Sequence, residues 1–196
     1  MLSDLLKDKK IILGSASPRR QDLLKSIIND FEIKVSDLKE KYPKSLKEKE
    51  ISEFLAIQKS DVFSIKIKTN EILITADTIV IKGDRILNKP KNKTQAKEML
   101  AFLSDSEHKV ITSVCLRNQQ KKLVFSSITK VFFKPLSNAE INYYVEEYKP
   151  LDKAGAYGIQ EWIGLIGITK IEGSYFNVVG LPIAKLYEKL IQFASF

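Results

Sequence analysis

The sequence predicts an α/β protein, because patterns typical of helices alternate with patterns typical of strands along the chain. Three observations carry this prediction: an apolar run near the N-terminus leads directly into a capped helix start, two stretches alternate like β-hairpins, and the last residues form an amphipathic helix. With 196 residues, 44% of them hydrophobic, the chain can build a core in one large domain or in two closely packed lobes. The order of the strands cannot be read from the sequence.

Residues 11–28 predict the first strand and the first helix. An apolar run over residues 11–13 ends at Gly14, and Ser17 followed by Pro18 is typical of an N-cap with proline at the first helical position. The next apolar residues recur at helical spacing and are expected to face a core; they are Leu23, Leu24, Ile27 and Ile28.

A second helix is predicted over residues 50–63, followed by a β-hairpin over residues 71–87. The helix has Ile51, Phe54, Leu55 and Val62 on one apolar stripe, with Lys59 at the edge of that stripe. The hairpin is expected to turn at residues 82–84, with Asp77 and Thr78 interrupting its first arm. Next, Thr94 is expected to cap a short helix that ends near Leu103, and residues 110–116 and 123–133 predict another hairpin.

The C-terminal third begins with a capping-box pattern, in which Ser137 and Glu140 precede a helix over residues 141–148 that Pro150 stops. Residues 152–182 hold six of the eight glycines, which indicates loops and short strands where the backbone closely approaches another group. The final helix is predicted from an apolar face; its members are Ile183, Leu186, Tyr187, Leu190 and Ile191.

Composition restricts the chemistry. One Cys and one His exclude a disulfide framework and argue against a zinc site of Cys and His ligands, so a bound metal would be held by carboxylates, which suits Mg²⁺ or Mn²⁺. The net charge of +8 favours an anionic partner but is spread along the chain. Neither a membrane span nor the apolar core of a signal peptide is present in the sequence, and we expect a soluble, cytoplasmic protein.

The stretch LGSASPRRQDLL, residues 13–24, is the first candidate for a functional site. Only four of the 32 basic residues are Arg, yet Arg19 and Arg20 stand side by side after Pro18. The predicted loop would bring Ser15, Ser17 and the Arg pair to the positive end of a helix, where backbone N–H groups and guanidinium forks favour phosphate oxygens. The alternative is an ordinary capped helix with exposed Arg side chains.

Three further residues have both a functional and a structural interpretation. Asp77 stands among apolar strand residues, where a charge requires a metal, a cation or a substrate, unless it lies at a strand end and points to water. Lys59 is either part of such a site or a surface lysine that extends its ammonium to solvent. His108, the one histidine, is interpreted as structural. Trp162 and the tyrosines at 143, 144 and 148 are interpreted as core or interface residues.

Six motifs taken together resemble those of the Maf proteins: SASPRRQ, LAIQKSD, TADTIV, NKP, DKAGAYGIQ and NVVGLP, in this order over nearly the whole chain. The resemblance implies a single domain over residues 1–196, with an elongated mixed β-sheet, flanking helices and two lobes around a central cleft, as in inosine triphosphate pyrophosphatases. It also implies a nucleoside triphosphate pyrophosphatase that releases pyrophosphate with the help of Mg²⁺ or Mn²⁺. Homodimers are common in the family.

The resemblance also implies roles for particular residues. SPRR and GIQ are similar to the branch of the family that acts on dTTP and UTP, whereas the branch that acts on 7-methyl-GTP usually has a bulky residue after the proline and Glu at position 160. Asp77 falls on the proposed proton acceptor. Substrate choice falls on Arg19, Thr78 and Gln160. Arg20, Glu40, Lys59 and Lys89 match other polar site positions of the family, although around Glu40 KEKYP departs from the usual acidic motif. Of these, Arg20 and Lys59 are expected to join Asp77 in catalysis, Lys89 and the loop residue Ser15 are expected to bind substrate, and Glu40 and Asp77 are candidate metal ligands.

Two other functions remain open at this point. One is a pyrophosphatase for a modified or purine nucleotide such as 7-methyl-GTP. The other is a nucleotide or nucleic-acid binding module that acts through its positive charge without hydrolysis. Under the main interpretation we expect a triphosphate substrate, no stable nucleic acid complex and no membrane partner.

Overall fold

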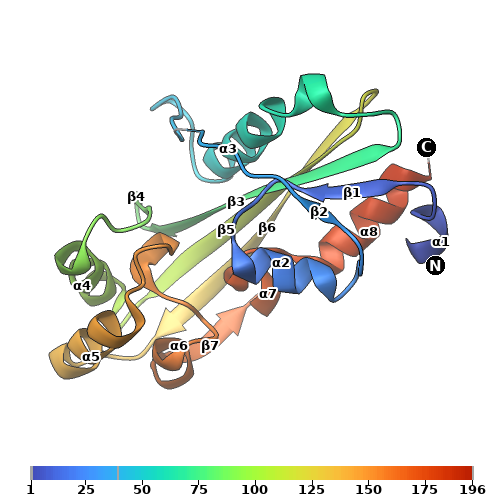
Figure 1. Cartoon of the computed structure of the whole chain (residues 1–196). Helices are drawn as coiled ribbons and strands as arrows, with labels where there is room; N and C mark the ends of the chain where they lie inside the picture. Colours follow the sequence, from blue (N-terminus) through green and yellow to red (C-terminus); the bar gives the residue numbers. More distant parts are fainter. Residues whose placement is uncertain (1, 39, 196) are drawn as a thin grey trace. The chain divides into compact units, whose positions relative to one another are not determined.

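The computed structural model describes residues 2–38 and 40–195, whose strands form one mixed sheet (Figure 1). The 7-stranded sheet has the order β2-β1-β3-β5-β6-β7, and β4 pairs with β3. Its strands are β1 (Lys10–Leu13), β2 (Glu32–Ile33), β3 (Glu71–Lys82), β4 (Arg85–Leu87), β5 (Glu107–Arg117), β6 (Lys122–Phe133) and β7 (Ile168–Glu172). β1 pairs in parallel with both β2 and β3, whereas β4 and β7 pair antiparallel with their neighbours. The predicted α/β class with a mixed sheet is confirmed.

Helices connect these strands and follow them. They are α1 (Leu2–Leu5), α2 (Pro18–Lys25), α3 (Lys49–Asp61), α4 (Lys93–Leu103), α5 (Asn138–Tyr148), α6 (Trp162–Gly167), α7 (Tyr175–Val179) and α8 (Ile183–Ala194), with short 3-10 helices η1 (Ser64–Lys66) and η2 (Ala154–Ala156). In Figure 1, α8 (red) lies beside α1 (blue) near the two ends of the chain, and α4 packs against α5.

The chain divides into two compact units. Unit 1 contains residues 1–77, 112–127 and 180–196, and unit 2 contains residues 78–111 and 128–179, so β3, β5 and β6 each contribute residues to both. In unit 1 the core gathers apolar residues of α1, α2, α8 and the strands, including Leu13, Leu24, Ile74 and Leu190. In unit 2 the core is built around α4, α5 and the segment 154–163, with Leu100, Tyr144 and Ile163 fully buried.

Several predictions from local patterns are confirmed. Pro18 opens α2, and β3 turns into β4 with Lys82 paired to Arg85. At α5 the side chain of Ser137 accepts a hydrogen bond from the N–H of Glu140, and the Glu140 carboxylate accepts one from the N–H of Ser137, so the capping box is complete.

Other predictions were wrong, and each has a physical reason. Asn92 caps α4, not Thr94, because the Asn92 side chain accepts the N–H of Gln95. Asp77 and Thr78 do not interrupt their strand, since β3 continues through both. Val62 follows the end of α3 and is 45% exposed, so it lies outside the apolar stripe. The glycine-rich residues 152–182 contain the short helices α6 and α7 in addition to β7.

Candidate active site

Glycine at position 14 allows the loop that follows β1 to start close to β3. The N–H of Gly14 donates to the carbonyl of Ile74 (2.8 Å), which extends the parallel pairing of the two strands by one residue. A Cβ at position 14 would lie 2.6 Å from the Cγ2 of Thr75, so a larger residue would push the loop away from β3. The loop therefore leaves the sheet beside the part of β3 that leads to Asp77.

The serines of this loop differ from the expected cap. Ser17 is the N-cap residue of α2, but its side chain makes no capping hydrogen bond. Instead, the N–H of Ser17 donates to the Oγ of Ser15 (3.3 Å). Ser15 thus fixes the turn before the helix, while Pro18 provides the backbone angle for the first helical residue.

The half-buried Arg20 side chain links three segments of unit 1. Its Nε donates to the carbonyl of Gly180 (2.9 Å), and its Nη1 donates to the carbonyl of Ala76 (2.8 Å) and to the Oγ of Ser15 (3.4 Å). Burial lowers the pKa of Arg20, whereas the charge of Asp77 raises it, and the guanidinium stays charged at neutral pH. Arg20 therefore fixes the backbone next to Asp77 through a forked set of donors that a lysine lacks.

Asp77, Lys59 and Glu40 form an ion cluster. The Nζ of Lys59 lies 2.5 Å from the Oδ1 of Asp77 and 2.8 Å from the Oε1 of Glu40. Asp77 is 5% exposed, and the Lys59 side chain is 17% exposed. The interpretations of Asp77 as a strand-end residue in water and of Lys59 as a surface lysine are therefore wrong: the cation that Asp77 requires is Lys59.

Burial raises the pKa of the Asp77 carboxyl above its usual range, while the charges of Lys59 and Arg20 act in the opposite direction. A carboxylate that burial makes more basic accepts a proton more readily than one in water. The electrostatics of the cluster thus suit a proton acceptor.

The oxygen donors of the cluster fit a hard divalent cation that is held jointly with a substrate. Among the described residues no group of three or more His, Cys, Asp or Glu could hold a metal by itself. Mg²⁺, however, is usually bound by one or two carboxylates together with phosphate oxygens and water. Asp77 and Glu40 converge on one ammonium and supply such a pair.

The remaining predicted site residues lie as follows. Arg19 is half-buried in the first turn of α2, in unit 1. Thr78, Lys89 and Gln160 belong to unit 2. Thr78 is half-buried on β3, Lys89 is exposed after β4, and Gln160 is exposed just before α6. The Gln160 amide makes no hydrogen bond within residues 2–38 and 40–195, which leaves it available to a ligand.

His108 has the expected structural role in the core of unit 2. Its Nε2 lies 2.7 Å from the hydroxyl of Tyr157, and its ring stacks on Phe133. Burial lowers the pKa of His108 to about 3, so its ring is neutral at physiological pH. Among the tyrosines, Tyr144 is fully buried as expected, and Tyr143 packs edge-on against Trp162.

Sequence reasoning missed three polar residues around Gln160. Lys153, Glu161 and Tyr144 form a connected polar network in unit 2, with Lys153 8% exposed. The available signal was a lysine in a stretch of small and apolar residues, which requires a partner once the stretch is buried. The sequence did not indicate that the partner is Glu161.

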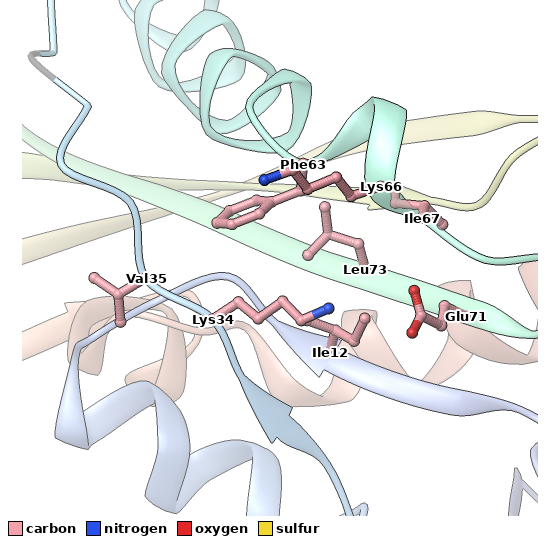
Figure 2. Close-up of a pocket in the computed structure, with 8 residues that line it drawn as sticks. All are labelled: Ile12, Lys34, Val35, Phe63, Lys66, Ile67, Glu71 and Leu73. Carbon is pink, nitrogen blue, oxygen red and sulfur yellow. The ribbon is translucent and has the colours of Figure 1, made fainter.

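Unit 1 also holds a cavity of about 290 Å³, which is lined by residues other than the predicted site residues (Figure 2). Figure 2 shows Leu73 on its floor, with Phe63 on one side and Lys34 on the other. None of the predicted site residues lines this cavity, so it is not where the candidate catalytic groups meet.

The fold places the chain in a known structural class. It is similar to the Ham1 protein of Staphylococcus aureus, with a TM-score of 0.55 and 15% identity over 94% of this chain and 100% of that one. The family follows from the sequence comparison: a model described as Maf-like protein matches residues 10–193, and the chain belongs to this family.

Relatives of high identity carry a specific name. The dTTP/UTP pyrophosphatase of Flavobacterium johnsoniae is 52% identical over 190 residues, which are 97% of this chain and 98% of the relative. Proteins of the same name from Christiangramia forsetii and Parabacteroides distasonis are 50% and 49% identical over 97% and 96% of this chain, and over 97% and 98% of their own lengths.

Proposed function

We propose that this chain hydrolyses dTTP and UTP between the α and β phosphates, giving the nucleoside monophosphate and pyrophosphate. The name that relatives of about 50% identity carry supports the reaction and the substrates. The observation that carries the proposal in the structure is the ion cluster of the buried Asp77 with Lys59 and Glu40. The family match includes residues of both units, which supports a single functional domain over residues 1–196.

Asp77 acts as the proton acceptor. A water oxygen forms a bond to the α phosphorus, the bond between the α phosphorus and the bridging oxygen breaks, pyrophosphate leaves with that oxygen, and Asp77 takes one proton from the water. Its raised pKa favours this transfer, and Lys59 holds the carboxylate in position through the 2.5 Å contact. Lys59 and Arg20 contribute positive charge near the reacting phosphates.

Mg²⁺ or Mn²⁺, held by Asp77 and Glu40 together with substrate oxygens, would neutralise charge on the leaving pyrophosphate. The charge of the ion cluster together with Arg20 supports this requirement. Two carboxylates offset Lys59 and Arg20, so these four side chains are formally neutral and do not by themselves compensate the several negative charges of a triphosphate.

Gln160 selects the base, and Arg19 and Thr78 modulate that choice. An amide offers both a donor and an acceptor, which suits the carbonyl oxygens and the N3–H of uracil and thymine. A carboxylate at position 160 would place acceptor against acceptor. Ser15 and Lys89 provide further polar contacts to the substrate.

The proposed activity also bears on the location of the protein and on its partners. No helix among the described residues is long and apolar enough to cross a membrane. The substrate is a free nucleotide, which supports a cytoplasmic location and argues against a stable nucleic acid complex. A homodimer is part of the proposal, and its test is the molecular mass in solution.

The deciding experiment incubates the purified protein with Mg²⁺ or Mn²⁺ and UTP, dTTP, CTP, GTP or 7-methyl-GTP, and measures phosphate and pyrophosphate separately. We expect pyrophosphate and the monophosphate from UTP and dTTP. Preference for GTP or 7-methyl-GTP would contradict the proposed substrates, release of single phosphates would contradict the proposed bond, and binding without cleavage would identify a nucleotide-binding module.

A further inference from the structure

The segment 152–161, which ends next to Gln160, is anchored by a polar network inside unit 2. The Nζ of Lys153 lies 2.7 Å from the Oδ1 of Asp152 and 3.1 Å from the Oε1 of Glu161. The other carboxylate oxygen of Glu161 accepts the hydroxyl hydrogen of Tyr144. The Tyr144 oxygen in turn accepts the N–H of Gly158 (3.0 Å). The network therefore connects both ends of the segment to α5.

The geometry of the segment depends on the position of the Glu161 carboxylate. Glu161 is the N-cap residue of α6, but its side chain makes no capping hydrogen bond and points instead into the network. Gly158 makes room for it, because a Cβ at position 158 would lie 2.7 Å from the Cδ of Glu161. A side chain at position 158 would therefore displace the Glu161 carboxylate.

Gln160 lies between two fixed points of this segment. On one side, Tyr157 is buried and bonded to His108 (2.7 Å). On the other side, Glu161 is held by Lys153 and Tyr144. Gln160 itself is exposed. A side chain that reads a base by hydrogen bonds needs a defined backbone position, because a shift of the order of 1 Å breaks such bonds.

We propose that Tyr144, Glu161 and Lys153 are positioning residues that determine base selectivity by fixing the backbone that carries Gln160. This inference rests on the proposed function and extends it to residues that do not touch the substrate. The network holds Glu161 through Lys153 and Tyr144, so the backbone next to it presents the Gln160 amide to uracil or thymine with little reorganisation.

The main test is Tyr144→Phe, which removes one hydroxyl and keeps the buried ring. We expect the ratio of kcat/KM for UTP to kcat/KM for CTP to fall about tenfold, mostly through KM for UTP, as for loss of a hydrogen bond that reads the base. The same shift is expected between dTTP and GTP. Tyr143→Phe is the matched control, because Tyr143 lies on the same helix, is 50% exposed, and packs its ring edge-on against Trp162.

A second variant, Gly158→Ala, tests the same network without removing any polar group, since the added Cβ displaces the Glu161 carboxylate. It should lower the same selectivity ratio. It also provides the test if thermal unfolding shows that Tyr144→Phe is not folded.

A double-mutant cycle separates positioning from a general structural role. If Tyr144 acts through Gln160, Tyr144→Phe should leave the selectivity ratio unchanged in a Gln160→Ala background. An equal loss for all four nucleotides, an unchanged ratio, or a further fall in the Gln160→Ala background would overturn the inference. A wild type that cleaves no triphosphate would instead overturn the proposed function itself.

Discussion

The ion cluster of unit 1 and the segment 152–161 of unit 2 present their candidate functional groups in opposite ways. In the ion cluster, Asp77 is buried, charged and bonded directly to Lys59. In the segment, Gln160 is neutral and exposed, and the charged groups are its neighbour Glu161, which is half-buried, and the buried Lys153 that pairs with Glu161. The first arrangement changes the basicity of the Asp77 carboxylate. The second fixes the position of the backbone that carries the Gln160 amide.

This difference matches the two tasks that the proposed reaction sets. Proton transfer depends on the pKa of the acceptor, which burial shifts strongly. Selection between bases depends on the placement of a donor and an acceptor, which requires a rigid support and an open approach. Substitutions in the ion cluster should therefore lower activity on every nucleotide, whereas substitutions around Gln160 should change the preference between nucleotides.

The largest effect is expected from Asp77→Asn. The amide cannot accept the proton, so kcat should fall at least about a hundredfold for all substrates while the fold and most of the triphosphate binding are retained. Steady-state kinetics and nucleotide binding measure this, with Asp84→Asn in the β3–β4 turn as the control. A turnover close to that of the wild type would remove Asp77 from the proposed mechanism.

Arg20→Lys should have the next largest effect. An ammonium cannot replace the fork that reaches the carbonyls of Ala76 and Gly180 together, so the backbone before Asp77 loses its support. We expect kcat/KM to fall roughly tenfold or more for UTP and CTP alike, and the melting temperature to fall as well. Arg85→Lys, at the exposed start of β4, is the control. If the two variants had the same kinetics, Arg20 would have no role beyond that of a surface residue.

Gln160→Glu should change preference more than overall activity. Acceptor would face acceptor in the complex with uracil or thymine, which costs about 1 to 3 kcal/mol, and kcat/KM for UTP and dTTP should fall about tenfold. Activity on 7-methyl-GTP should be spared or rise. The measurement compares five nucleotides, UTP, dTTP, CTP, GTP and 7-methyl-GTP. A uniform decrease across them would assign Gln160 to the shared triphosphate chemistry.

The sequence predicted those features that depend on neighbouring residues. The start of α2 at Pro18 and the Ser137–Glu140 capping box are local, and both are present. The α4 cap was expected at Thr94, two residues from Asn92, because both residue types can cap a helix. The backbone decides between them: Asn92 is extended and lies just before the first helical residue.

Features that depend on residues far apart in the chain could not be predicted from patterns. Asp77 was expected to interrupt its strand and, unless it pointed to water at a strand end, to require a metal, a cation or a substrate. The partner is Lys59, which α3 contributes from a distant part of the chain. The donors of Arg20 go to backbone carbonyls, which have no signal in the sequence. The family resemblance named the candidate residues, but the Tyr144–Glu161 contact is visible only once the chain is folded.

The smallest expected effect concerns stability and tests whether the support behind Gln160 depends on a neutral His108. The ordinary pKa of histidine is about 6.5, and burial lowers that of His108 to about 3 in the folded protein. Between these values the unfolded chain binds a proton that the folded protein does not, so this contribution to stability is complete only well above pH 6.5 and is lost as the pH falls through 6.5 toward 3. Between pH 7.5 and pH 6 the loss should be about 0.8 kcal/mol.

Urea unfolding of the wild type and of His108→Gln at both pH values measures this contribution. Asp77, whose raised pKa has the opposite pH dependence, is present in both proteins and cancels in the difference. His108→Gln should be nearly insensitive to this pH change relative to the wild type, because the chain has no other histidine. An identical pH dependence in the two proteins would show that His108 is protonated equally in the folded and unfolded states. Its contact with Tyr157 would then not require a neutral ring, and the anchor next to Gln160 would be independent of pH in this range.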